Sequence, residues 1–166
     1  MTSAKLTTPL VSILVSVLLS VSLATSAQEA FSLKGYMLGQ SMAQCPPETQ
    51  QQKDIGSSSV VCILGPTTFA GQPAPSHGFV ITNGTISMIT ISLPARGRYA
   101  GSEALAALRE KHGTPTTEKG HINEYEWWKN GEMLKFDGYG GAVSLVNPAE
   151  LRRDRDQAEK KNKSDL

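Results

Sequence analysis

The sequence predicts an α+β domain in which two α-β-β-β halves form an antiparallel sheet with helices packed on one face. Three observations lead to this fold. Residues 102–115 have the pattern of a helix, and short stretches rich in β-branched and aromatic residues lie on both sides of it. Two Asn-Gly pairs, which begin at Asn83 and Asn130, are typical of the tight turns that join hairpin strands. The pattern of one helix followed by three strands occurs twice, and two such units can share one core.

The clearest helix begins near Ser102, whose side chain can cap the first turn. Leu105 and Leu108 form an apolar stripe that can face a sheet. Gly113 suits a left-handed end to the helix, and Pro115 prevents the helix from continuing.

The first half is predicted to open with a shorter helix that begins after Ser41 and ends at Pro46-Pro47. Residues 49–59 are polar and Ser-rich, so we expect a loop there. Residues 60–64 are β-branched and followed by Gly-Pro, which predicts a buried strand. We expect a second surface loop over residues 67–76, because this stretch contains one Gly and two Pro.

A hairpin is predicted to join residues 78–82 to a long strand over residues 85–93. The apolar residues of that second strand change parity between Met88 and Ile89. Because side chains alternate between the two faces of a strand, this change predicts either a bulge near these residues or burial of both faces.

The second half is predicted to contain strands over residues 124–129, 132–136 and 142–146. In the first of these strands, alternation places Tyr125 and Trp127 on one face and Trp128 on the other. At least one large aromatic side chain is therefore expected on the face of the sheet that helices do not cover.

Residues 1–27 have the features of a cleaved signal peptide, with Lys5 before a short apolar run and small residues before a cut between Ala27 and Gln28. An uncleaved anchor is the alternative, although the apolar run is short for a membrane span. We therefore expect a periplasmic or secreted protein with no transmembrane segment after cleavage.

The mature chain is expected to form one domain over residues 28–148, with halves at about 28–95 and 96–148, followed by a charged tail over 149–166. The tail carries 11 charged side chains from Glu150 onward and is predicted to be helical or disordered. Without Lys5, acidic and basic side chains are equal in number, 15 of each, which argues against a nucleic-acid partner.

The two cysteines, Cys45 and Cys62, both lie in the mature region. In an exported chain with no other thiol, we expect them to form one disulfide. Two cysteines with no nearby histidine make a poor zinc site, and we expect no metal and no cofactor.

Two motifs resemble those of a known group of proteins. Gly39-Gln-Ser41 opens the first predicted helix, and Leu108-Arg-Glu-Lys-His-Gly-Thr-Pro115 closes the second. Both resemble the helix signatures of small exported domains grouped with β-lactamase-inhibitor proteins, a group that includes small lipoproteins of the outer-membrane barrel-assembly machinery. The resemblance covers most of the mature chain in layout, but this sequence lacks the lipoprotein cysteine and Pro46-Pro47 shorten the first helix. It implies a protein-binding or envelope-assembly role without catalytic residues.

The three histidines, His77, His112 and His121, are the side chains best suited to move protons near neutral pH. They are not spaced as metal ligands on one element, so surface histidines with no catalytic role are the simpler interpretation. An enzyme is therefore not expected, and a small periplasmic hydrolase that uses a histidine is kept as the alternative, together with an envelope scaffold.

The strongest candidate for a binding surface combines Arg96, Arg98 and Tyr99, in the connection between the halves, with Trp128. Two guanidinium groups near an exposed indole are typical of a binding hot spot. The alternative is that the arginines are merely solvated and that Trp128 covers an edge of the helix. From these residues we expect a non-enzymatic module that binds a protein or an envelope component.

Overall fold

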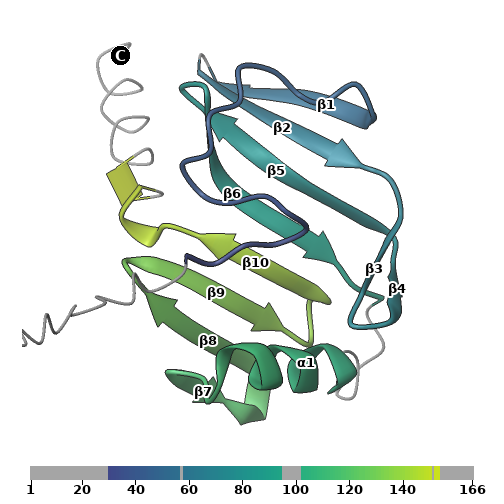
Figure 1. The fold of residues 1–166 in the computed structure, drawn as a ribbon, viewed down its shortest axis with the longest axis vertical. Helices are drawn as coiled ribbons and strands as arrows, with labels where there is room; N and C mark the ends of the chain where they lie inside the picture. Colours follow the sequence, from purple (N-terminus) through teal and green to yellow (C-terminus); the bar gives the residue numbers. More distant parts are fainter. Residues whose placement is uncertain (1–29, 57, 95–101, 151, 154–166) are drawn as a thin grey trace, which may run out of the picture.

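The protein is described by a computed structural model over residues 30–56, 58–94, 102–150 and 152–153. Its centre is an eight-stranded antiparallel sheet with the strand order β1-β2-β5-β6-β10-β9-β8-β7 (Figure 1). The elements in chain order are β1 (Thr49–Gly56), β2 (Ser59–Leu64), β3 (Thr67–Phe69), β4 (Gln72–Ala74), β5 (Ser76–Thr82), β6 (Thr85–Ser92), α1 (Ser102–His112), β7 (Thr117–Lys119), the 3-10 turn η2 (Gly120–Ile122), β8 (Glu124–Lys129), β9 (Glu132–Asp137) and β10 (Ala142–Val146). Strands β3 and β4 form a separate two-stranded sheet.

The large sheet consists of two runs of strands that meet at its centre. Strands β1, β2, β5 and β6 pair in chain order on one side, and β7 to β10 pair in chain order on the other. Pairing of β6 with β10, from Ser92↔Ala142 to Met88↔Val146, joins the two runs. An antiparallel sheet with a helix is thus present, but the prediction of two α-β-β-β halves is not confirmed. Each run has four strands, and the described residues before β1 contain no helix.

The predicted first helix after Ser41 is wrong. The chain there is bent and partly extended, and it lies against the start of β6. The amides of Gly39 and Met42 donate hydrogen bonds to the carbonyls of Ile86 and Gly84, both at 2.8 Å. Pro46-Pro47 leaves room for about one helical turn after Ser41, and a single turn does not repay the entropy of helix nucleation. The backbone groups of this N-terminal segment are paired with the sheet instead.

Two predicted loops are strands in the structure. Residues 49–56 form β1, an edge strand that pairs with β2, and its side chains from Gln50 to Ile55 are exposed. Both faces of this edge strand are exposed to solvent, so its sequence does not alternate between apolar and polar residues. This explains why the sequence resembles a loop. Residues 67–74 form the β3–β4 hairpin around Ala70 and Gly71, which both have positive φ.

The predicted second helix is confirmed as α1. It ends where Gly113 adopts a φ of 78° and donates its amide hydrogen to the carbonyl of Arg109. Ala104 and Leu108 are its buried residues, while Leu105 is only partly buried. They join a core on one face of the sheet, to which the N-terminal segment contributes Phe31 and Leu33. Residues 148–150 and 152–153 are also helical, but helices packed together on one face are not confirmed.

A bulge in β6 explains the parity change of the sequence. Ile81 pairs with Ile86 and Val80 pairs with Met88, so Ser87 is an extra residue with no partner of its own. The predicted bulge is therefore present, one residue before Met88. It turns both Ile86 and Ile89 to the core and Met88 to the opposite face.

Candidate functional site

The sheet face opposite the core carries an unbroken row of apolar side chains across six strands. The pairings Val61↔Val80 and Val80↔Met88 continue through Met88↔Val146, Val146↔Met133 and Met133↔Trp128. Directly opposed residues of antiparallel strands point to the same face. We call this set the apolar row; its members are Val61, Val80, Met88, Val146, Met133 and Trp128.

The apolar row is accessible to solvent along most of its length. The indole of Trp128 is 44% exposed, and the side chains of Val61, Val80, Met88 and Met133 are half-buried. Only Val146, near the middle of the row, is buried at 4% exposure. The matching row on the other face includes Phe79, Ile89 and Leu145, which are at most 3% exposed. The side chains on the two faces of the same strands therefore differ sharply in their exposure to solvent.

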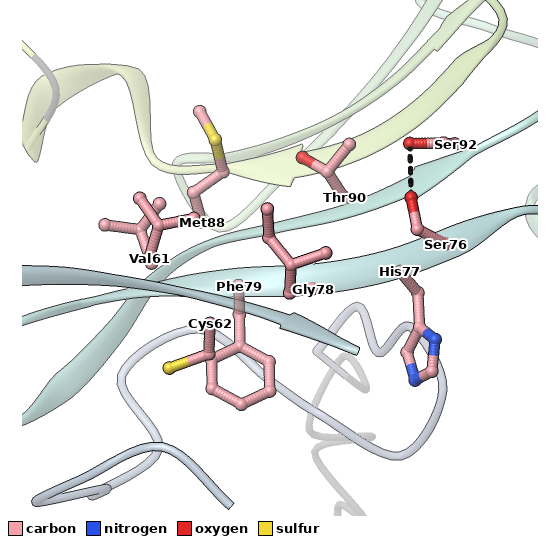
Figure 2. Close-up of a pocket in the computed structure, with 11 residues that line it drawn as sticks. Val61, Cys62, Ser76, His77, Gly78, Phe79, Met88, Thr90 and Ser92 are labelled. Carbon is pink, nitrogen blue, oxygen red and sulfur yellow. Dashed lines mark hydrogen bonds between the residues drawn. The ribbon is translucent and has the colours of Figure 1, made fainter. Parts of the chain in front are cut away.

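A hollow of about 200 Å³ lies over the part of the apolar row on strands β2, β5 and β6 (Figure 2). Its walls include Val61, Met88 and Thr90, and Ser76 donates a hydrogen bond of 3.1 Å to Ser92 at one end. Gly78 is the third residue of the lining strand β5, and it has no side chain to fill this space.

Gly78 has a steric reason to be glycine. A Cβ at this position would collide with the carbonyl oxygen of Cys62 on the neighbouring strand β2. The strands β2 and β5 thus approach each other more closely than any side-chain-bearing residue would permit.

Charged side chains border the apolar row on strands β7 to β9. The ammonium group of Lys135 donates a hydrogen bond of 2.9 Å to Glu124, and Lys119 lies 3.5 Å from the same carboxylate and 3.9 Å from that of Glu126. The hydrogen bond from Lys135 is the main reason why the pKa of Glu124 is lowered. This face therefore combines the apolar row with a border of ion-paired charged side chains.

The structure describes one of the four predicted partner-binding residues. Trp128 is on the face opposite Trp127, as alternation predicted; Trp127 is 3% exposed and its indole donates a hydrogen bond of 2.9 Å to the carbonyl of Gly113. The indole of Trp128 donates to a carboxylate oxygen of Glu126 at 3.3 Å. Arg96, Arg98 and Tyr99 lie outside the described residues.

The three histidines occupy different surroundings. His77 is hydrogen-bonded through Nδ1 to the carbonyl of Gly65 at 3.1 Å, and His121 is exposed in η2. His112 packs against Phe31 in a T-shaped arrangement, with 5.1 Å between ring centroids. Within the described part of the chain, no group of three or more His, Cys, Asp or Glu is placed to hold a metal ion.

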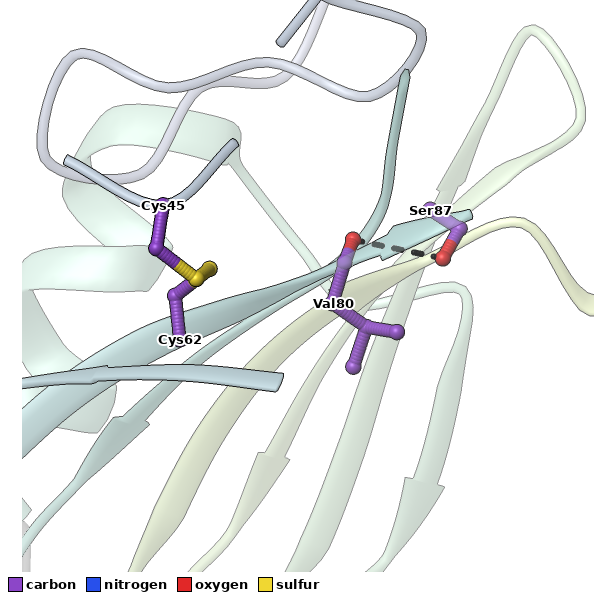
Figure 3. Close-up of a disulfide and its surroundings, with 4 residues drawn as sticks. All are labelled: Cys45, Cys62, Val80 and Ser87. Carbon is purple, nitrogen blue, oxygen red and sulfur yellow. Dashed lines mark hydrogen bonds between the residues drawn. A yellow bond between two sulfur atoms is a disulfide. The ribbon is translucent and has the colours of Figure 1, made fainter. Parts of the chain in front are cut away.

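Cys45 and Cys62 form the predicted disulfide, with 5.6 Å between their Cα atoms (Figure 3). The bond ties the N-terminal segment to β2, rather than a helix to a strand. Figure 3 also shows the bulge, where the hydroxyl of Ser87 donates a hydrogen bond of 3.3 Å to the carbonyl of Val80. The disulfide lies on the core side, because Cys62 is fully buried there.

Most of the apolar row was missed from the sequence. The signal available was the parity of Met88, which differs from that of Ile89 and Ile91. Combining that parity with the two hairpin turns would have placed Val80 and Met133 on the same face, but the joining of β6 to β10 has no local signal.

In the residues that the structure describes, no helix is long and apolar enough to cross a membrane. Comparisons with known proteins found no family model, no curated protein and no solved structure that matches this chain.

Proposed function

We propose that this chain is an exported, non-enzymatic module that binds a protein partner of the cell envelope on the sheet face opposite its core. The observation that carries the proposal is the apolar row, which stays accessible at Trp128, Met133 and Met88. Neighbouring strands lie about 4.8 Å apart, so a row across six strands spans about 24 Å. A standard interface buries about 800 Å² on each partner, which is a patch roughly 30 Å across, so the row would run along most of such an interface.

The composition of the face supports a protein partner. Aromatic residues and methionine are enriched at interface centres, and charged residues are commoner at their rims. Trp128, Met133 and Met88 belong to the apolar row, and the Glu124–Lys135 ion pair lies at its border. Export is supported by the Cys45–Cys62 disulfide, which is typical of oxidising compartments, and by the signal-peptide features of residues 1–27.

The resemblance to exported domains grouped with β-lactamase-inhibitor proteins supports the same kind of role. The hydrolase alternative has less support, because His77 is hydrogen-bonded to a backbone carbonyl and His112 packs against an aromatic ring. Among the described residues, neither histidine is hydrogen-bonded to a carboxylate or to the side chain of a Ser, Thr or Cys, which is the arrangement that activates a nucleophile.

The test uses a photo-crosslinking amino acid placed at Met88 or, as a control, at Ile55 on the edge strand β1. Both variants are incubated with an envelope fraction, and the crosslinked protein is purified and its affinity for the unlabelled module measured. We expect a saturable crosslink from position 88 that excess unlabelled module removes. Equal crosslinking from position 55, or none from position 88, would contradict the proposed surface.

Alanine variants then measure the contribution of the apolar row. Truncation of an interface hot spot costs about 2 kcal/mol or more, so Trp128→Ala with Met133→Ala should weaken binding by more than about tenfold. Ile55→Ala with Tyr139→Ala is the matched control, because these side chains are 52% and 50% exposed elsewhere on the surface. Unchanged affinity in the first variant, with an unchanged melting midpoint, would refute the role of the row.

A further inference from the structure

A second cleft lies on the core side of the molecule, away from the apolar row. It has a volume of about 220 Å³ and is formed by α1, the β3–β4 hairpin and the N-terminal segment. Its lining includes Leu33, Phe69 and Leu108, which supply an apolar floor. Leu33 and Leu108 are buried and Phe69 is partly buried, so the cleft reaches down to the core.

Among the described residues, the titratable side chains that line this cleft are all basic. They are Lys34 from the N-terminal segment and Lys111 and His112 from the last turn of α1. No described lining residue is acidic, and neither lysine forms an ion pair with another described residue. Both lysine side chains are exposed, so a ligand at the cleft mouth would meet two ammonium groups above an apolar floor.

The pKa of His112 reflects both its burial and the positive charges near it. Burial is the largest cause of its lowered pKa, and the charges of Lys111 and Lys129 lower it further. Lys129 belongs to β8, and its ammonium group lies 5.8 Å from the centre of the Phe31 ring. Glu132 of β9 is the acidic group nearby on the same side, and it accepts a hydrogen bond of 3.3 Å from the amide of Phe31.

Two tight turns that carry lining residues have unusual sequences. Lys34 and Ala70 adopt φ angles of 55° and 50°, and each is followed by a glycine with positive φ. The other two turns of this kind place asparagine at the same position, at Asn83 and Asn130, which is the residue that tolerates a left-handed backbone best. The chain thus departs from the favoured turn residue at the two turns that border the cleft.

We propose that this cleft binds a small carboxylate with an apolar tail. The tail lies on the apolar floor, and the carboxylate lies at the mouth between Lys34 and Lys111. A volume of about 220 Å³ is below the ~300–1,000 Å³ of sites for drug-sized ligands, so the ligand must be small, such as a short-chain carboxylate. Few, well-placed polar groups around an apolar pocket are typical of small-molecule sites.

The test is an amide NMR titration of the purified, disulfide-bonded protein with sodium hexanoate. We expect saturable shifts at Leu33, Ala107 and Lys111. Hexanol, which lacks the charge, and acetate, which lacks the tail, should each bind at least about tenfold more weakly, since the site needs both parts. Affinity should also fall in about 0.5 M sodium chloride, because exposed ammonium groups are screened by salt.

The decisive variant is Lys34→Gln with Lys111→Gln, which we expect to weaken hexanoate binding by at least about tenfold. Lys53→Gln with Lys119→Gln is the control, because it removes the same charge from two exposed lysines, on β1 and β7, that do not line the cleft. Shifts that do not saturate, shifts that map to the apolar row, or equal binding by both double variants would overturn the proposal. If the first variant does not fold, salt-independent binding of hexanoate to the unaltered protein would overturn it as well. The outcome is independent of the proposed protein partner, because the two sites lie on opposite faces of the sheet.

Discussion

Removal of the Cys45–Cys62 disulfide tests how the N-terminal segment is held to the sheet. The bond closes a loop with a sequence separation of 17, and this loop contains the whole of β1. In the chain-entropy model, a loop of this size contributes about 3 kcal/mol, because the open chain has more freedom when unfolded. Loss of a fully buried sulfur at Cys62 adds the cost of a small cavity in the alanine variant.

We therefore expect Cys45→Ala with Cys62→Ala to lower the free energy of unfolding by about 3–4 kcal/mol. For a domain of this size, this corresponds to a melting midpoint lower by roughly 10–15 °C. Urea unfolding, followed by the fluorescence of the buried Trp127, measures the change.

Reduction of the unaltered protein is the matched control, since it opens the loop and keeps both sulfur atoms. The reduced protein should lose about 3 kcal/mol, slightly less than the double alanine variant. A loss below about 1 kcal/mol would refute the loop-closure reasoning. It would mean that the hydrogen bonds of Gly39 and Met42 to the start of β6 hold the segment without help.

Two further predictions concern substitutions at single positions. Gly78→Ala should lower the free energy of unfolding by about 1–3 kcal/mol, because its Cβ meets the backbone of Cys62. Gly120→Ala, where a Cβ meets no atom within 4 Å, should change it much less, and equal losses in urea unfolding would contradict the steric argument. The pKa of His112 is lowered by burial and then by Lys111 and Lys129, so the folded protein binds this proton less tightly than the unfolded chain. The stability that depends on neutral His112 is thus complete above pH 6.5 and is lost as pH falls through the lower folded pKa. The melting midpoint of the unaltered protein should fall between about pH 7.5 and about pH 5, and His112→Asn should reduce this fall. His121→Asn is the control and should not reduce it. Identical pH profiles for the unaltered protein and both variants would exclude the effect.

The elements that the sequence predicted correctly have strong local signals. The helix ends at Gly113 because glycine adopts a positive φ at little cost, and Pro115 follows it. The turns at Asn83 and Asn130 also have left-handed backbones, at φ 51° and 52°, which is the reason that Asn-Gly pairs indicate hairpins. Trp127 and Trp128 point to opposite faces because alternation is a property of the strand itself.

The elements that were missed depend on partners distant in the chain. The polar strand β1 exists because β2 offers it a ladder from Leu64 to Ser59, and nothing in its own sequence requires a strand. The segment around Ser41 is bent and partly extended because its backbone is hydrogen-bonded to Ile86 of β6 and to Gly84 in the turn before β6. The apolar row needs the register of five strand pairs at once, so single-strand patterns could identify Trp128 and Met88 but not the row itself.

The joining of β6 to β10 governs how the chain reaches this structure. Thr90 and Ser144, whose hydroxyl groups are 3.3 Å apart across this pair, are separated by 54 residues. Strand neighbours within each run are local in sequence, whereas this contact closes a long loop whose entropy must be repaid late in folding. On the core face, the buried side chains of Ile89 and Leu145 meet at the same junction, so neither run can bury its apolar side chains alone. We expect folding in one slow, cooperative step, with amides of β6 and β10 exchanging hydrogen only on global unfolding, and fast exchange at β10 would show that the second run opens separately.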